Sequence, residues 1–336
     1  MTHGRRVLHK AAVTRKRLAR RVPVVVLLVV TAVATSCARE DTPRSAAAPA
    51  TIRIVTGPRG LTFGPLGEAL AASYARKIPD LRFVAISTPG TETNLHRLQA
   101  GDAELALSVA NIAYTAYGGL DAQFRPSAGN LRTIAVLHPS SVHVLVPARS
   151  TARMMTDMDG RVAVGPEGSG LTAKTLIQQF ALTNKVVVDQ TLPLSDVPDA
   201  LASGQIDGAV IVAADPVEVV ERAIANGARL IPLAKQDLQR LRTGYPFLRP
   251  GAIPAGIYPG VSQPVATMLV DVLLVTRAGL DDELVRRLTS ALFEILPDLA
   301  GPFPYLGLMS MQRAPATPIP LHPGAALFYR ERELTR

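Results

Sequence analysis

The chain contains one sequence pattern twice, and this duplication constrains its fold more than any other feature. LQAGDAELALSV at Leu98–Val109 matches LASGQIDGAVIV at Leu201–Val212. Upstream, the turn GPRG at Gly57–Gly60 corresponds to GPEG at Gly165–Gly168. In each copy an apolar run enters the glycine turn and a helix-like stretch leaves it. The Leu-x-x-Gly-acidic pattern alone is also common where a helix ends and a strand begins. Because the glycine turn and this pattern recur together in the same order, the sequence predicts two similar α/β lobes.

The duplicated turns also predict where a ligand binds. A helix N-terminus presents unpaired N–H groups and the positive end of the helix dipole, and both favour an anion. If each lobe aims a glycine turn and a helix N-terminus at a shared cleft, the lobes can close on a small ligand.

Most of the formal charge of +9 comes from the N-terminal segment. Eight of the 36 Lys and Arg residues precede Cys37 and no Asp or Glu does, so 28 basic residues face 27 acidic ones in the remainder. A basic surface for nucleic acid is therefore not expected. With 48% hydrophobic residues, 4% aromatic residues and no Trp, the composition suits an α/β protein rich in Ala, Val and Leu.

The N-terminal segment has the pattern of a secretory signal. Basic residues precede the uncharged run Val22–Ser36, and the small residues ATS precede Cys37. This arrangement resembles a lipoprotein signal, whose cysteine is diacylated and becomes the first residue of the mature protein, although Ala34 replaces the usual Leu. Cleavage by ordinary signal peptidase is the alternative, and Arg20-Arg21 leaves twin-arginine export open. The apolar run is shorter than the ~20 residues that span a bilayer.

The rest of the chain is predicted to form two lobes. We expect the signal segment at 1–37, a tether at 38–50, lobe I at 51–145, lobe II at 146–250, and a return to lobe I with C-terminal helices at 251–336. Strands and helices alternate, as in parallel βαβ units; the expected elements include strands at Ile52–Val55, Leu81–Ile86, Leu105–Val109 and Ile134–Val146 and helices at Gly64–Lys77 and Thr91–Gln99. Asp281-Asp282-Glu283 heads a further helix and is interpreted as capping. Cys37 is the only cysteine, so no intrachain disulfide is expected.

Several motifs together resemble one family of receptors. They are TGPRGLTFGPLG (Thr56–Gly67), STPGTETNLHRLQAGDAELAL (Ser87–Leu107), NIAYTAYGG (Asn111–Gly119), VAVGPEGSG (Val162–Gly170), GQIDGAVIVAADP (Gly204–Pro216), IPAGIYPG (Ile253–Gly260) and LHPGAALFYRE (Leu321–Glu331). In this order they are similar to the TAXI family, the extracytoplasmic solute receptors of tripartite ATP-independent periplasmic (TRAP) transporters. The resemblance covers the chain from Ile52 to Glu331.

The resemblance implies a fold, a function and partners. The fold is a two-lobed α/β clamshell of the periplasmic-binding-protein type (type II-like) with a central cleft. The function is capture of a small organic anion or amino acid, such as glutamate or a related carboxylate, for an ion-driven membrane permease. Together with the signal, it implies a lipid-anchored monomer on the extracytoplasmic face, with neither cofactor nor catalysis. A sensory lipoprotein that reports to a membrane signalling partner is the alternative, and an exported enzyme comes third.

The resemblance also implies a set of ligand-binding residues. In lobe I they are Gly60, Thr62, Phe63, Thr88, Thr91, Asn94, Asn111 and Tyr114, and in lobe II and the segment that follows they are Ser169, Gly170, Thr172, Asp215 and Tyr258. Arg59 is added as a departure from the family, which uses small and hydroxyl residues in this turn. Its planar guanidinium can bind a carboxylate, and a solvated loop arginine is the alternative. Thr91 can instead cap its helix. Core, turn or hinge roles are open for Asp215 and Tyr258.

Other chemistries fit the sequence less well. GSGLTAKT at Gly168–Thr175 differs from a phosphate-binding P-loop because Ala173 stands where glycine is required before Lys174. His138 and His143 have no third ligand nearby in the sequence, which disfavours zinc. Ser169 has no Gly-x-Ser-x-Gly elbow and no evident His partner, so a hydrolase is not expected.

Overall fold

The computed structural model describes residues 50–120, 122–245 and 247–334, which belong to one compact unit. The predicted signal, the lipidation site Cys37 and all of the predicted tether except Ala50 lie outside the described residues. Within the described part, no helix is long and apolar enough to cross a membrane.

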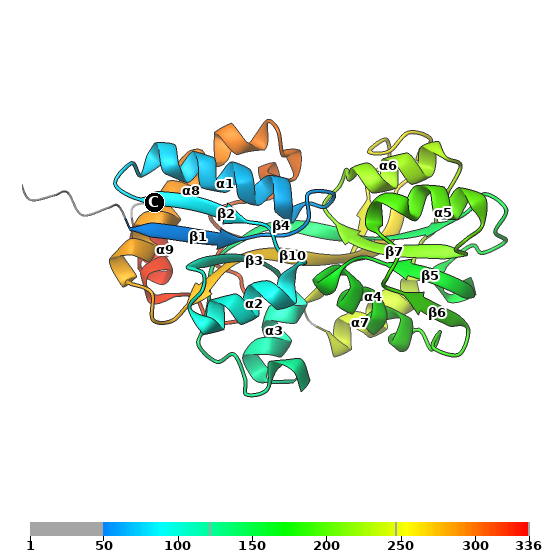
Figure 1. The fold of residues 1–336 in the computed structure, drawn as a ribbon, viewed down its shortest axis with the longest axis horizontal. Coiled ribbons are helices and arrows are strands. Elements are labelled where there is room, and N and C mark those ends of the chain that lie inside the picture. The colour runs from blue at the N-terminus through cyan, green and yellow to red at the C-terminus, as the bar shows by residue number, and fades with distance from the viewer. Residues whose placement is uncertain (1–49, 121, 246, 335–336) are drawn as a thin grey trace, which may run out of the picture. The chain divides into compact units, whose positions relative to one another are not determined.

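A single mixed sheet runs through this unit (Figure 1). Its main path has the order β2-β1-β3-β10-β4-β7-β5-β6, with β8 added to β4 and β9 to β10. The strands are β1 (Thr51–Val55), β2 (Arg82–Ile86), β3 (Leu105–Val109), β4 (Leu131–Val146), β5 (Gly160–Val164), β6 (Val186–Asp189), β7 (Gly208–Ala213), β8 (Arg229–Leu230), β9 (Leu248–Ile253) and β10 (Val265–Arg277).

The two halves of the sheet repeat one topology. In the first half β1 lies between β2 and β3, all parallel, and β10 joins β3 antiparallel. In the second half β5 lies between β6 and β7, again parallel, and β4 joins β7 antiparallel. The long strands β4 and β10 pair with each other and connect the halves. The two-lobed α/β fold predicted from the duplication is therefore confirmed.

Helices cover both faces of each half (Figure 1). Around the first half, lobe I, lie α1 (Phe63–Lys77), α2 (Thr91–Ala100), α3 (Ala110–Gly118), α8 (Asp282–Ala300) and α9 (Pro323–Leu334). Around the second half, lobe II, lie α4 (Glu167–Gln179), α5 (Val197–Ser203), α6 (Glu218–Ala225) and α7 (Lys235–Gly244).

Apolar residues at helical spacing hold α1 and α8 together. Leu66, Leu70 and Tyr74 of α1 are almost fully buried, and the Tyr74 hydroxyl donates to the Leu288 carbonyl of α8 at 3.2 Å. At the start of α8 the Asp281 side chain accepts a bond from the backbone N–H of Leu284 at 2.8 Å. The capping role predicted for the acidic triplet is confirmed for Asp281.

The repeated Leu-x-x-Gly-acidic pattern has a physical explanation in both lobes. The glycine ends a helix in the left-handed conformation, with φ of 79° at Gly101 after α2 and 84° at Gly204 after α5. Three residues later an acid accepts the backbone N–H of an arginine on the neighbouring strand: Glu104 accepts from Arg53 at 2.8 Å, and Asp207 accepts from Arg161 at 2.9 Å. The pattern thus joins a helix end to a parallel strand pair, once in each lobe.

Candidate functional site

Three helix N-termini from both lobes meet at one cavity. The first turns of α1 and α2 approach it from lobe I, and the first turn of α4 approaches it from lobe II. The cavity has a volume of ≈ 40 Å³, and its lining residues are Pro58, Leu61, Thr62, Phe63, Pro89, Gly90, Thr91, Val109, Ser140, Pro166, Gly168, Ser169, Val212 and Ala213. This is room for a few water molecules, much less than the roughly 300 Å³ at the lower end of ligand pockets. The lobes must therefore lie further apart around a ligand.

The lining of this cavity contains no charged side chain but offers several hydrogen-bonding groups. Thr62, Thr91, Ser140 and Ser169 supply hydroxyls. The first-turn N–H groups of the three helices have no partner within their own helices, and the helix dipoles place positive potential there. Such a site can hold an anion through hydroxyls and backbone N–H groups, as helix N-termini commonly do.

Glu167 connects the lobes at the rim of the cavity. Its carboxylate, at the start of α4, accepts from the backbone N–H of Thr93 at 2.9 Å and from the Thr93 hydroxyl at 2.5 Å. Thr93 lies in the first turn of α2, so a negative charge from lobe II already occupies the N-terminus of a lobe I helix. Glu167 has a φ of 24°, which is uncommon for a residue with a side chain.

Two further hydrogen bonds cross between the lobes. The hydroxyl of Thr62, the residue before α1, accepts from the backbone N–H of Ala214 at 3.1 Å. The Asn111 amide of α3 donates to the Thr172 hydroxyl of α4 at 2.9 Å. The structure is therefore a closed arrangement of the lobes.

Glycine permits this close approach of α4 to lobe I. A Cβ atom added to Gly168 would lie 2.6 Å from the Thr91 hydroxyl oxygen and 3.1 Å from a Val109 methyl group. The first of these contacts is too short for real atoms, so any larger residue at this position forces the lobes apart.

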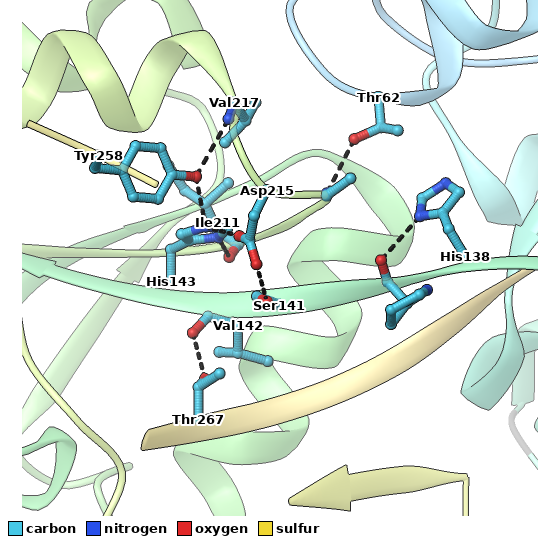
Figure 2. Close-up of polar contacts among 12 residues, drawn as sticks. Thr62, His138, Ser141, Val142, His143, Ile211, Asp215, Val217, Tyr258 and Thr267 are labelled. Atoms are coloured by element: carbon cyan, nitrogen blue, oxygen red, sulfur yellow. Dashed lines mark hydrogen bonds and ion pairs between the residues drawn. The ribbon is translucent and has the colours of Figure 1, made fainter. Parts of the chain in front are cut away.

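A buried polar network lies beside the cavity, where β4 and β7 meet the loop after β9. Figure 2 shows the His143 ring with Nε2 2.7 Å from Asp215 Oδ1 and 2.8 Å from the Tyr258 hydroxyl oxygen. The Ser141 hydroxyl donates to Asp215 Oδ2 at 2.6 Å, and the Val217 N–H donates to the Tyr258 hydroxyl at 3.2 Å. Burial, together with the nearby Asp215 carboxylate, raises the pKa of Tyr258, so its hydroxyl keeps its proton.

This network positions a segment of the cavity wall. Ala213 lines the cavity, and the backbone N–H of Ala214 donates to Thr62 of lobe I. Asp215 is the next residue in the chain. Because Asp215 is held by Ser141 and faces His143, the segment cannot move without breaking buried polar contacts. Ser141 bonds to Asp215 rather than to His143, so the three side chains do not form the arrangement of a nucleophilic triad.

The histidines of β4 are buried strand residues. The His138 ring packs against Tyr305, with ring centroids 4.5 Å apart, and burial lowers its pKa to about 4. Among the described residues, no group of three His, Cys, Asp or Glu side chains could hold a metal ion.

The residues predicted from the sequence fall into four places. Those that line the cavity between the helix N-termini are Thr62, Phe63, Thr91 and Ser169. Asn111, Tyr114 and Thr172 lie around α3, beside other cavities. Asp215 and Tyr258 belong to the network of Figure 2. The remaining five, Arg59, Gly60, Thr88, Asn94 and Gly170, do not line the first cavity.

Thr88 and Asn94 support the turn behind the cavity. The Asn94 amide is fully buried and donates to the carbonyls of Thr56 and Leu107 at 2.6 and 2.8 Å, and the Thr88 hydroxyl donates to Asn94 at 2.7 Å. Arg59 points elsewhere: its side chain is 83% exposed and pairs with Glu68 at 3.1 Å.

Sequence reasoning did not select Glu167, His143, Ser140 or Ala213 for the site. Glu167 could have been selected from the sequence, because it occupies the position in the duplicated turn that Arg59 occupies in lobe I. The others depend on pairings between distant segments, which no local motif reports.

Comparison with known protein families gives the family of this chain. A family model described as the NMT1-like family matches residues 54–332. Among solved structures, the alkanesulfonate-binding protein SsuA from Xanthomonas axonopodis pv. citri, bound to MOPS, is 16% identical, with 85% of each chain covered and a TM-score of 0.47. A putative L-cystine ABC transporter protein from Listeria monocytogenes is 13% identical (77% of this chain and 97% of that chain, TM-score 0.45). An ancestral arginine-binding protein bound to arginine is 14% identical (78% and 100%, TM-score 0.47).

Proposed function

The chain belongs to the NMT1-like family, and we propose that it is an extracytoplasmic solute-binding protein that captures a small organic anion or amino acid between its lobes. The observation that carries this proposal is the convergence of three helix N-termini, from both lobes, on one cavity without charged side chains. Carboxylates such as glutamate and related acids suit these donors.

In the proposed mechanism, ligand binding shifts a population between open and closed lobes. The open form exchanges ligand, and the closed form is stabilised by ligand contacts from both lobes. The contact of Glu167 with Thr93 shows how a carboxylate can be held at the N-terminus of α2. We infer that the closed form is recognised by a membrane permease of the TRAP type, and that the protein itself carries out no catalytic step.

Mass spectrometry of small molecules that co-purify with the protein tests the ligand class. We expect a carboxylate or amino acid in stoichiometric amount, bound in a way that slows hydrogen exchange in the first turns of α1, α2 and α4 together. A ligand that protects only one lobe contradicts closure and indicates a one-sided pocket.

The proposed anchor has a separate test. If Cys37 is diacylated, metabolic labelling with palmitate marks the native chain, and Cys37→Ala abolishes the label while leaving the protein exported. An unlabelled native chain contradicts the lipoprotein assignment but not the ligand site.

A further inference from the structure

A second, larger cavity lies on a different part of the molecule. It has a volume of ≈ 340 Å³ and shares no lining residue with the cavity at the helix N-termini. Its walls come from α3, from β9 and the residue before it, from β10, and from the loop that precedes α9. This volume falls within the roughly 300–1,000 Å³ of small-molecule sites.

One wall of this second cavity carries a pair of opposite charges. Arg249 donates from Nη2 to Asp271 Oδ1 at 2.5 Å, and the two side chains are 39% and 18% exposed. Neither the other nitrogens of the guanidinium nor Asp271 Oδ2 has a hydrogen-bond partner among the described residues. Arg313, which is not part of the lining, approaches Asp271 Oδ1 to 3.8 Å. Both members of the pair thus keep free hydrogen-bonding groups at a solvent-accessible cavity.

Aromatic rings form another part of the lining. The Tyr114 side chain of α3 is 37% exposed, and its ring centroid lies 5.3 Å from that of Phe247. The Tyr245 ring also packs against Phe247, with ring centroids 5.8 Å apart. An exposed aromatic ring with a rigid backing is a suitable surface for an apolar or aromatic ligand group.

We propose that this second cavity binds a zwitterionic α-amino acid with an apolar or aromatic side chain. The α-carboxylate accepts from Arg249, the α-ammonium donates to Asp271, and the side chain lies against Tyr114 and Phe247. The proposal does not depend on the function proposed for the first cavity.

The charges of the lining favour a zwitterion over a simple ion. A free anion is attracted by Arg249 and repelled by Asp271 at nearly the same distance. A free cation is attracted by Asp271 and repelled by Arg249. A zwitterion placed head to tail against the pair is attracted by both groups. Since both side chains are only partly buried, their ion pair contributes modestly by itself, and sharing its charges with a ligand costs little stability.

Isothermal titration calorimetry of the purified protein with three probes tests the proposal. L-phenylalanine carries both charges, 3-phenylpropanoate lacks the ammonium, and 2-phenylethylamine lacks the carboxylate. We expect L-phenylalanine to bind with 1:1 stoichiometry, and each of the other probes to bind about tenfold or more weakly because a charge-assisted hydrogen bond is lost. Failure of L-phenylalanine to bind at millimolar concentration, or equal binding of 3-phenylpropanoate, overturns the proposal.

Variants locate the bound probe. The double change Arg249→Gln with Asp271→Asn keeps a polar side chain at both positions and removes both charges, and we expect a loss of about tenfold or more in affinity for L-phenylalanine. The matched control is Arg287→Gln with Asp80→Asn, which removes another exposed pair, 2.9 Å apart, outside the cavity; we expect it to leave affinity unchanged. Tyr114→Ala removes a partly exposed ring and serves if the double variant fails to fold; it too weakens binding.

A further variant separates this proposal from the proposed function. Phe63→Trp fills the first cavity, and we expect unchanged affinity for L-phenylalanine. If Phe63→Trp abolishes binding and the Arg249 and Asp271 double variant retains it, the amino acid binds in the first cavity. That result overturns the second site and leaves the proposed function standing.

Discussion

The turns GPRG of lobe I and GPEG of lobe II occupy equivalent places and send their third side chains in opposite directions. Arg59 points to solvent and pairs with Glu68 of its own lobe. Glu167, at the rim of the cavity, accepts two hydrogen bonds from Thr93 of the other lobe. In lobe II the following helix begins at Glu167 itself, whereas in lobe I it begins at Phe63, four residues after Arg59.

This difference shows that the duplication preserves the order of strand, turn and helix but not the roles of the side chains in the turn. The turn brings a helix N-terminus to the cavity in both lobes. The charge on the third residue then decides which lobe supplies a carboxylate to the other, and here lobe II does so through Glu167.

Substitution of the last glycine of each turn, Gly60 or Gly168, is expected to give the largest difference between the lobes in its effect on closure. Gly168→Val places atoms within the Thr91 side chain and, at the upper end of overpacking effects, disfavours closure by about 3 kcal/mol. Gly60→Val is the control, because a Cβ there meets only a Leu194 methyl group at 4.0 Å. Hydrogen exchange in the first turns of α2 and α4 should become faster in the first variant only. Equal effects would show that the turns contribute alike.

Glu104 and Asp207, the acids of the repeated Leu-x-x-Gly pattern, allow the contribution of this pattern to stability to be compared between the lobes. The Glu104 side chain is 10% exposed and Asp207 is 49% exposed. We expect Glu104→Gln to lower the free energy of unfolding by about 2 kcal/mol, and Asp207→Asn by about 1 kcal/mol or less, because exposed ion pairs contribute less. Urea denaturation measures both, and a larger loss for Asp207→Asn would reverse the comparison.

The Glu104 effect should also depend on pH. Burial raises the pKa of Glu104, but its bonds to Arg53 outweigh burial and hold the pKa below the ordinary 4.5. A carboxylate whose pKa is lowered by folding stabilises the fold above its unfolded pKa and loses that contribution as the pH falls through the folded pKa. The difference in stability between the native chain and Glu104→Gln should therefore shrink below pH 4.5.

Glu167 itself gives a smaller and more specific effect. Glu167→Gln keeps one acceptor for Thr93 but removes the charge, which should disfavour the closed state by about 1 kcal/mol. Faster hydrogen exchange at the Thr93 amide, with a free energy of unfolding lowered by no more than this amount, is the expected signature. An unchanged exchange rate would mean that other contacts hold the lobes together.

Arg59→Ala should have the smallest effect on closure, about 0.5 kcal/mol or less, because its ion pair with Glu68 is exposed. Its effect on ligand affinity is the sharper measurement. A loss of tenfold or more would show that Arg59 turns inward to bind a carboxylate, as its position in the sequence predicts, whereas unchanged affinity leaves the helix N-termini as the anion donors.

The features that the sequence predicted well are those that depend on local pattern. The buried stripe of Leu66, Leu70 and Tyr74, the cap at Asp281 and the duplicated helix-to-strand connection all follow from spacing within a few residues. The lining residues Thr62, Thr91 and Ser169 were predicted from the family resemblance, and each stands in or next to the first turn of a helix.

The features that the sequence did not predict join distant segments. Glu167 and Thr93 are 74 residues apart, and His143 and Tyr258 are 115 residues apart. Arg249 meets Asp271 only because β9 pairs antiparallel with β10. No single segment carries these contacts, so they follow only from the assembled sheet.

The strand β10 has a consequence for the order in which the lobes are completed during synthesis. The parallel strands β1, β2 and β3 lie near the start of the described chain, but the strand that covers the free edge of β3 spans Val265–Arg277. The core sheet of lobe II, in contrast, draws β4, β5, β6 and β7 from residues 131–213. Although domains usually fold in the order of their synthesis, here β3 must wait for β10 with an unpaired edge, whereas β7 finds its antiparallel partner β4 already made.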